Sequence, residues 1–388
     1  MSVPGMFKYP LPFELSEFKD RVARVRSVMK RQDIDVLILT SPENIFYLSA
    51  FQTPGFYMFE ALVLPLDDEP FMVAREAESP WVKARSWIQK SSYYSDHTDP
   101  VKVLAKAMSQ AKCARGKVAV EKKSWFLTVE RYEQLKKLLP KARLVDGSWI
   151  VENIRLLKSS AELEYMRQAA KIVDKTMQAG IDAIAEGRTE NDVAAEVYKT
   201  MISEGSVYPG AHPYIVSGKR TGIMHANYEG RVIEKGDQVF LEIPACVNRY
   251  HSAMMRTTII GQAPDKIVKM AEASIRGLEV AIQAIKPGRT SAEVDAEVRS
   301  EVTRMGFGDA FRHRTAYSIG IAFPPTWGEE IAHIREKDKM ILKPGMVFHV
   351  ILSLRILEIG GVGFSESIAV TKDGAEVLGK FQRKLFTK

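Results

Sequence analysis

The pattern of apolar and polar residues in the first 150 positions changes repeatedly between helical and strand spacing. Apolar residues recur every three or four positions from Phe18 to Met29 and predict a helix, and a second helix is predicted over residues 127–139. Short, continuous apolar segments predict buried strands, and these are DVLILT from residue 35, ALVLP from 61, FMVA from 71 and KVAVE from 117. This order indicates an α/β domain.

The remainder of the chain contains an internal repeat. AIAEGRTENDVAAEV at residues 183–197 matches AIKPGRTSAEVDAEV at residues 284–298, with a constant offset of 101 residues that extends to Gly205 and Gly306. Each copy reads as a helix, a Gly-Arg-Thr break and a second helix. Thr290 with the acidic residue three positions later forms a capping box, and Thr189 has a weaker equivalent.

Strands follow each predicted helix pair, at residues 214–217, 238–244 and 250–260 in the first copy and at 347–353 and 361–371 in the second. The pattern predicts an α+β domain with an internal pseudo-twofold duplication and a pocket between the halves. We expect two domains, at residues 1–155 and 156–388.

Composition narrows the class of protein. Hydrophobic residues make up 46% and charged residues 27% of the chain, as in ordinary globular proteins, and no apolar run reaches the ~20 residues that span a bilayer. The net charge of +7 is spread along the chain without a nucleic-acid-binding motif. Pro4, Pro10 and Pro12 interrupt any signal peptide, and the two cysteines, Cys113 and Cys246, suggest no disulfide framework. We expect a cytoplasmic protein that binds neither nucleic acid nor membrane.

Several motifs in the second domain resemble the creatinase/prolidase/methionine aminopeptidase family, which has the pita-bread fold. They are HANYEGRVIEKGDQVFLE at 225–242, RYHSAMMRT at 249–257 and PGMVF at 344–348. LTSPENIFYLS at 39–49 is similar to the N-terminal domain of the creatinase and prolidase branch. The resemblance covers essentially the whole chain.

The resemblance also maps the metal ligands of the family onto this chain. Metal-dependent members hold two divalent ions with two aspartates, a histidine and two glutamates. The matching positions here are Glu242, Ala253, Tyr317, Ile351 and Ser365. Only Glu242 is a good ligand, and choosing Glu366 in place of Ser365 restores at most a second one. We expect no metal and no other cofactor.

Further motifs are similar to the metal-free branch of the family, which contains creatinase and ectoine hydrolase. They are RYH, YSIG followed by PPTWGE, the pair FH and the triplet SES, which lie between residues 249 and 367. Two departures leave the substrate open. Met255 stands where creatinase has a glutamate, and residues 351–364 differ from what an ectoine hydrolase implies.

Cleavage of a C–N bond without a metal requires a nucleophile or base and a proton donor, and we look for candidate catalytic residues that meet these requirements. A carboxylate, Glu242, attacks the substrate carbon or polarises water. The resemblance assigns proton transfer to His225, and His349 complements it because it lies two positions from Ile351 on the same strand face. Glu366, on the last strand, orients a histidine or binds a cationic substrate group.

Candidate substrate-binding residues come from alternation, from the resemblance and from aromatic character. Alternation from Ala253 predicts that His251 and Met255 face the pocket. Tyr317 and Trp327 are candidates to line it. The resemblance to creatinase implies a homodimer in which Phe56 and Tyr57 of one subunit cover the site of the other.

These residues predict a metal-independent hydrolase that cleaves a C–N bond of an amide, amidine or cyclic amidine in a small zwitterion, in the manner of ectoine hydrolase or creatinase. One alternative is a metal-dependent Xaa-Pro aminopeptidase or dipeptidase. Another is a non-catalytic relative that only binds a small molecule.

Overall fold

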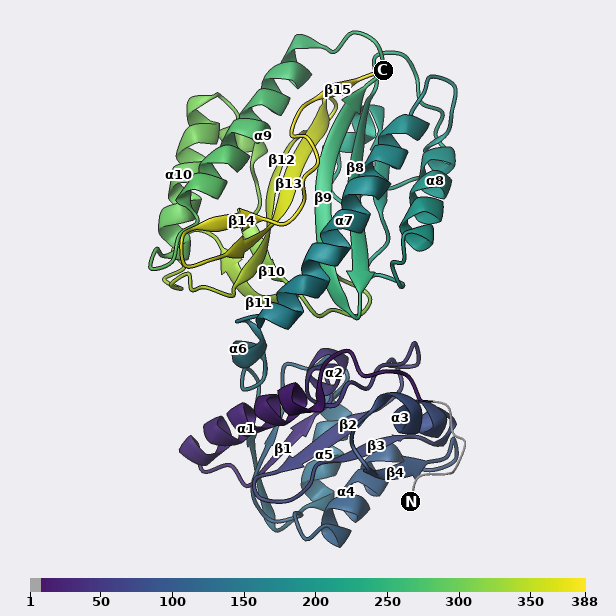
Figure 1. The fold of residues 1–388 in the computed structure, drawn as a ribbon, viewed down its shortest axis with the longest axis vertical. Coiled ribbons are helices and arrows are strands. Elements are labelled where there is room, and N and C mark those ends of the chain that lie inside the picture. Colours follow the sequence, from purple (N-terminus) through teal and green to yellow (C-terminus); the bar gives the residue numbers. More distant parts are fainter. Residues whose placement is uncertain (1–7) are drawn as a thin grey trace. The chain divides into compact units, whose positions relative to one another are not determined.

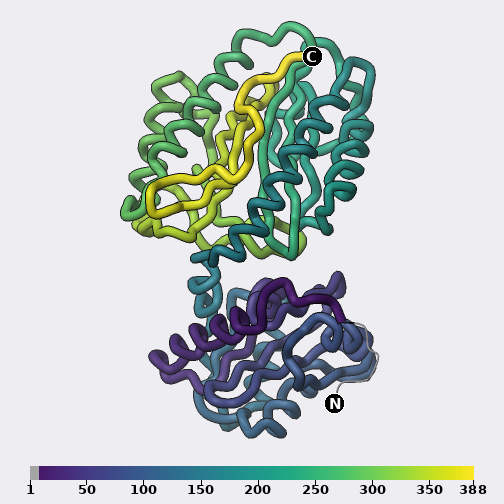
Figure 2. The backbone as a smooth tube through the Cα atoms, in the orientation of Figure 1, coloured from purple at the N-terminus to yellow at the C-terminus, as the bar shows by residue number. Residues whose placement is uncertain are grey.

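The computed structural model describes residues 8–388, which form two compact units divided between Arg155 and Leu156. Pro4, one of the three prolines near the start of the chain, lies outside the described residues. Figure 2 follows the chain through both units, from purple at the N-terminus to yellow at the C-terminus.

The first unit is the predicted α/β domain. Its six-stranded sheet has the order β4-β3-β2-β1-β5-β6. The strands are β1 (Val36–Leu39), β2 (Ala61–Pro65), β3 (Phe71–Arg75), β4 (Lys90–Tyr94), β5 (Gly116–Val120) and β6 (Ala142–Asp146). The helices are α1 (Leu15–Arg31), α2 (Pro42–Ser49), α3 (Ser79–Arg85), α4 (Pro100–Gln110), α5 (Val129–Leu138) and α6 (Glu152–Arg155). Apolar residues of the sheet pack against α4 and α5 to form the core of this unit.

The second unit consists of two copies of a helix pair followed by strands (Figure 1). The first copy contains α7 (Ser160–Ala183), α8 (Glu190–Ser203), β7 (Tyr214–Ser217), β8 (Gln238–Val247) and β9 (Tyr250–Ile259). The second contains α9 (Asp265–Ala284), α10 (Ser291–Arg304), β10 (Ala316–Ile319), β11 (Gly328–Ile334), β12 (Val347–Ile356) and β13 (Gly360–Val370). The short strands β14 (Ala375–Val377) and β15 (Phe386–Thr387) end the chain.

The duplication predicted from the repeat is visible in the hydrogen bonds of the two halves. Thr189 and Thr290 each cap the N-terminus of a helix in a complete capping box. Two residues earlier, Gly187 N donates to Ile233 O at 2.9 Å, and Gly288 N donates to Leu342 O at 2.9 Å. Equivalent sequence positions therefore have equivalent structural roles, which confirms the pseudo-twofold duplication.

The strands form two half-sheets, of order β15-β9-β8-β7 and β11-β10-β12-β13-β14, that meet along β9 and β13. Ser252 Oγ donates to Ser367 Oγ across this seam at 2.9 Å, and Met255 N donates to Ser365 Oγ at 2.7 Å. In Figure 1, α7 and α9 run along the strands on the same side of the sheet. The helices cover one face and leave the other available for a site.

Strand alternation decides which side chains reach each face. Leu241, Ile243 and Ala245 of β8 pack with α7 and α8 in one core cluster. Leu352 and Leu354 of β12 pack with α9 and α10 in a second. The intervening residues of both strands therefore face the helix-free side. None of the helices within residues 8–388 is long and apolar enough to cross a membrane.

Candidate active site

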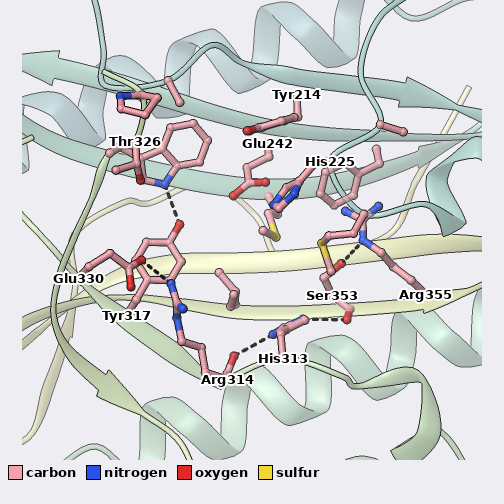
Figure 3. Close-up of a pocket in the computed structure, with 18 of the residues that line it drawn as sticks. Tyr214, His225, Glu242, His313, Arg314, Tyr317, Thr326, Glu330, Ser353 and Arg355 are labelled. Carbon is pink, nitrogen blue, oxygen red and sulfur yellow. Dashed lines mark hydrogen bonds and ion pairs between the residues drawn. The ribbon is translucent and has the colours of Figure 1, made fainter. Parts of the chain in front are cut away.

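A cavity of about 660 Å³ lies on the helix-free face of the second unit and draws its walls from both halves of the duplication (Figure 3). The first half supplies Ala211, Tyr214, Met224, His225, Ala226, Phe240, Glu242 and Met255. The second half supplies His313, Arg314, Tyr317, Pro325, Thr326, Trp327, Glu330, Arg335, Ile351, Ser353 and Arg355. A pocket between the halves is what the repeat predicts.

Glu242 is a carboxylate in the wall of this cavity, on the central part of β8. Its side chain forms no hydrogen bond with any of residues 8–388, and the residue is only 8% exposed. Burial raises the pKa of Glu242 to about 7, while the positive charge of Arg355 lowers it by a smaller amount. A carboxyl group that titrates near neutral pH is suited to nucleophilic or acid/base chemistry.

His225 lies next to Glu242 in the cavity, as Figure 3 shows. Its backbone has φ +62°, a left-handed conformation that costs energy for a residue with a side chain. Burial lowers the pKa of the imidazole, and the charge of Arg355 lowers it further. His225 is therefore neutral at neutral pH and able to accept a proton from a group bound beside Glu242.

A chain of hydrogen bonds fixes Tyr317, whose hydroxyl reaches the cavity on the other side of Glu242 (Figure 3). Trp327 Nε1 donates to the Tyr317 hydroxyl oxygen at 2.7 Å. The same oxygen lies 2.7 Å from His349 Nδ1, and His349 Nε2 lies 2.7 Å from Ser365 Oγ. Burial, followed by the charge of Glu242, keeps the pKa of Tyr317 well above its usual value, so the hydroxyl stays protonated.

Four charged residues of the cavity were not identified from the sequence. Arg314 and Glu330 form an ion pair, with 2.6 Å between Arg314 Nη2 and Glu330 Oε1. Arg335 pairs with Asp338 at 3.2 Å. Arg355 projects from β12. Alternation from Ile351 would have found Arg355, because residues 351, 353 and 355 share one face of the strand.

The expected role of Glu366 is wrong, because its side chain is on the opposite face of the sheet. In the register of β12 and β13, Ser365 lies opposite Ile351, and a step of one residue reverses the face. The Glu366 carboxylate accepts a hydrogen bond from Arg256 Nη2 at 2.7 Å, and both side chains are buried. Glu366 is a structural residue away from the cavity.

The two remaining strand histidines also need correction. His251 shares a face with Met255, but within the described chain it does not line the cavity. Its Nε2 accepts from Gly210 N at 2.8 Å and its Nδ1 pairs with Gly320 O at 3.2 Å. His349 lies behind Tyr317 and does not line the cavity either. Burial lowers the pKa of each to about 3, so neither carries a proton to substrate at neutral pH.

The other expected substrate-binding residues lie in two places. Met255, Tyr317 and Trp327 line the cavity. Phe56 and Tyr57 belong to the first unit, between α2 and β2. Phe56 packs edge-to-face against Phe126, with ring centroids 6.0 Å apart, whereas Tyr57 is 70% exposed.

Comparison with known proteins identifies the family. The profile of metallopeptidase family M24 matches residues 164–372, and that of the creatinase/prolidase N-terminal domain matches residues 21–157. The chain therefore belongs to metallopeptidase family M24 and carries a creatinase/prolidase N-terminal domain. This family consists of hydrolases.

Individual relatives of the chain have different names. The chain is 31% identical over 401 residues to a protein named ectoine hydrolase from Halomonas elongata, covering 99% of this chain and 100% of the relative. It is 27% identical to an Xaa-Pro dipeptidase from Pyrococcus furiosus, and the match covers 95% of this chain and 99% of that relative. A solved structure of a prolidase from Thermococcus sibiricus matches with a TM-score of 0.87 at 24% identity, covering 96% of this chain and 99% of the prolidase chain. This match confirms the pita-bread fold.

The family name raises the question of whether these residues fit a pair of metal ions, and they do not. At the five positions where the resemblance places ligands, Ala253 and Ile351 have no donor atom. The hydroxyls of Tyr317 and Ser365 are both engaged by His349. Residues 8–388 contain no group of three or more His, Cys, Asp or Glu side chains that could hold a metal ion. Glu242 alone is a poor basis for a dinuclear centre.

Proposed function

We propose that the protein hydrolyses a C–N bond of an amide, amidine or cyclic amidine in a small zwitterionic substrate, without a metal ion. The observation that carries this proposal is the Glu242 carboxylate, which lies in the cavity wall without a hydrogen-bonding partner among residues 8–388 and beside the neutral imidazole of His225. The 31% identity to a protein named ectoine hydrolase supports a substrate that is not a peptide.

The side chains of the cavity provide each part of such a reaction. A Glu242 oxygen attacks the substrate carbon to form a covalent acyl intermediate that water then hydrolyses, or Glu242 removes a proton from a water that attacks the carbon. In the water route, the proton that Glu242 removes passes to the leaving nitrogen through His225 as the C–N bond breaks. In the covalent route, the protonated form of His225 donates its proton to the leaving nitrogen, and His225 then regains a proton from the water that hydrolyses the intermediate. The protonated Tyr317 hydroxyl provides a hydrogen bond to charge that develops on the substrate.

A substrate panel tests the proposal. Purified protein would be treated with excess chelator and incubated with ectoine, creatine, N-acetylated diamino acids and Xaa-Pro dipeptides, with products read by mass spectrometry. Turnover of a non-peptide substrate that persists in chelator is the expected result. Activity that chelator abolishes and manganese or cobalt restores would refute it.

A single-turnover reaction in ¹⁸O-labelled water separates the two routes. Direct attack by Glu242 leaves the label in the Glu242 carboxylate when water adds to the Glu242 carbonyl carbon, and an acid quench during the turnover finds the acyl group on Glu242 whichever carbon the water attacks. Water activation leaves the protein unlabelled. Peptide mass spectrometry of the segment that contains Glu242 distinguishes these outcomes.

An Xaa-Pro dipeptidase is the second candidate, favoured by the relative of that name at 27% identity. It requires a metal centre at positions where Ala253 and Ile351 provide no ligand. Cleavage of Xaa-Pro dipeptides by the metal-loaded protein, together with stoichiometric bound metal, would establish it.

We also propose that the protein acts in the cytoplasm as a homodimer in which Tyr57 of one subunit covers the cavity of the other. The exposed ring of Tyr57 supports a covering role, since an aromatic side chain excludes water from a neighbouring site. Sedimentation gives the oligomeric state. Tyr57→Ser is expected to lower kcat/KM without changing the free energy of unfolding, and an unchanged kcat/KM would contradict this role.

A further inference from the structure

Arg355 places a positive charge beside Glu242, and no carboxylate among residues 8–388 forms an ion pair with it. The residue is 9% exposed, lines the cavity, and forms no ion pair with any acidic side chain of residues 8–388. We propose that Arg355 binds the carboxylate of the substrate, so that the cavity takes N-acyl or cyclic amidine derivatives of amino acids with the scissile carbon at Glu242. This inference rests on the proposed function and specifies its substrate class.

Residues 8–388 accept hydrogen bonds from only two of the three guanidinium nitrogens of Arg355. Nη1 donates to Thr221 O at 2.6 Å and to Ile223 O at 3.0 Å, and Nε donates to Ser353 Oγ at 3.0 Å. Its central carbon lies 4.6 Å from the centre of the Phe240 ring, which supports one face of the group. Nη2 forms no hydrogen bond within the described chain, so its two N–H groups remain for a ligand.

A buried charge is costly unless it is paired, and the neighbouring groups do not pair with Arg355. The Thr221 and Ile223 carbonyls and the Ser353 hydroxyl are neutral acceptors. Glu242 is the charged side chain that acts on Arg355, and it makes no hydrogen bond to it. The charge of Arg355 lowers the pKa values of Glu242 and His225, which shows that it acts on the reacting groups.

The charges of the cavity favour a monoanion as the occupant. Of the other cations in its described wall, Arg314 is paired with Glu330 and Arg335 with Asp338. While Glu242 is protonated, Arg355 therefore leaves about one positive charge to be matched. A substrate carboxylate oxygen can accept a charge-assisted hydrogen bond from Nη2, whereas a phosphate dianion would need a second cation.

The chain around Arg355 is built to hold the side chain in this position. A Cβ atom on Gly361 would lie 2.3 Å from Thr221 O and 3.0 Å from Arg355 Cγ, so a larger residue would separate the arginine from its carbonyl acceptor. A Cβ atom on Gly363 would lie 2.4 Å from the Phe240 ring. These glycines belong to the segment at 351–364 that departs from the ectoine hydrolase pattern, so this departure forms the anion site.

Binding of matched ligand pairs tests the inference without depending on turnover. Ectoine and N-acetylglycine would each be compared with the corresponding carboxamide by calorimetry, with Glu242→Gln as the non-hydrolysing host. The host is expected to bind the carboxylates about 10- to 100-fold more tightly than the carboxamides, as for a charge-assisted hydrogen bond. Adding Arg355→Gln is expected to reduce this ratio to about one.

The ratio of carboxylate to carboxamide affinity also distinguishes a ligand-binding role of Arg355 from a purely structural one. If Arg355 only held the Thr221 and Ile223 carbonyls, Arg355→Gln would weaken carboxylate and carboxamide equally, which would overturn the inference. Arg335→Gln is the matched control, because it removes a paired cavity arginine and is expected to change the ratio less than about threefold.

Two further results would overturn the inference: no preference for carboxylate in the host, or no binding of either carboxylate. Suppose that the preference for carboxylate over carboxamide is lost in Arg355→Gln, but wild-type protein converts none of the candidate substrates. That result would support the anion site and refute the proposed hydrolase activity. Failure of the two proposals is therefore distinguishable.

Discussion

Glu242 and Glu366 are two buried glutamates on strands of the same unit, and their surroundings suit them to different proposed roles. Glu366 is paired with Arg256 at 2.7 Å on the helix side of the sheet. Glu242 faces the cavity, and burial raises its pKa to about 7. An unpaired buried carboxyl group reduces stability, and such groups concentrate at functional sites.

The first prediction separates these roles by substitution. Glu242→Gln is expected to lower kcat by at least about 100-fold while leaving ligand binding measurable, since it removes the reacting carboxylate. It is also expected to raise the free energy of unfolding at pH 8 by roughly 1–3 kcal/mol, because the folded protein no longer holds a desolvated charge. Thermal unfolding at pH 8 and single-turnover kinetics measure the two effects.

Glu366→Gln is the control for this prediction. Removing one partner of the buried pair leaves Arg256 uncompensated and is expected to cost about 3–5 kcal/mol. If Glu242→Gln instead destabilised the protein by a similar amount, Glu242 would be a structural residue. Wild-type protein that binds ligands but never converts them would favour a binding protein.

The second prediction concerns pH. The pKa of Glu242 is about 7 in the folded protein and 4.5 as its reference value, so the unfolded carboxyl group loses its proton first as pH rises. The Glu242 contribution to stability is therefore greatest below about pH 4.5 and falls between there and about pH 7. On the proposed function, activity follows the opposite trend, because the ionised Glu242 carboxylate is the form that attacks or acts as a base.

We expect kcat/KM to rise with pH and level off above an apparent pKa of about 7. Initial rates between pH 5.5 and 8.5 at constant ionic strength would measure this profile. A profile that falls over this range would mean that Glu242 acts in its protonated form.

For single residues, the sequence predicts the face of the strand on which a side chain lies better than it predicts whether that side chain lines the cavity. Alternation places Met255 in the cavity, and it places His251 and His349 on the same side of their strands. The cavity is shorter than the strands, however, and both histidines lie beyond its wall, bonded to Gly210 and to Tyr317. Nothing in the alternation of the strands shows where a cavity ends.

The connection between β8 and β9 shows how an element positions the site. Asn248 and Arg249 have φ values of +47° and +66°, which correspond to a two-residue type I′ hairpin turn. Arg249 is fully buried, and it donates from Nη1 to Tyr208 O at 2.8 Å and from Nε to Ala322 O at 3.1 Å. Since Ala322 follows β10, this turn fixes the first half of the duplication to the second.

The third prediction tests that link. Arg249→Met is expected to lower the free energy of unfolding by about 2–5 kcal/mol, because buried carbonyl groups lose their donors. Arg304→Ala, on the exposed surface, is the control and is expected to change it by less than about 0.5 kcal/mol. Urea denaturation measures both, and equal small effects would show that the turn does not join the halves.

Elements with a strong internal pattern were predicted from the sequence, the edge strand β7 among them, whereas the edge strand β4 and the inner strand β10 were not. The helix pairs and their caps follow from the repeat, and the central strands follow from continuous apolar runs. Strand β4, with the sequence KSSYY, lies at the edge of the first sheet and is only partly buried. Its pairing with β3 is a tertiary effect that no local apolar pattern records.

The second unit combines the fold of metallopeptidase family M24 with a cavity whose residues do not match the family's pair of metal ions. The duplication brings Glu242 on β8 and Arg355 on β12 to one cavity (Figure 3). On the proposed function, the Glu242 carboxylate attacks the substrate or activates water, as the ions do in metal-dependent members of the family, and Arg355 holds the substrate carboxylate beside it.

The last prediction tests for a metal centre in the protein and needs no knowledge of the substrate. A metal site with micromolar affinity for Mn²⁺ or Co²⁺ at 1 mM would stabilise the folded state by about 3–4 kcal/mol and raise the Tm by several degrees. Because Ala253 and Ile351 offer no ligand atoms, we expect the Tm to change by less than about 1 °C. A metal-loaded member of the family measured in parallel provides the positive control. A rise of several degrees with two ions bound per chain would establish a metal centre and would transfer the role of attacking group from Glu242 to a metal-activated water.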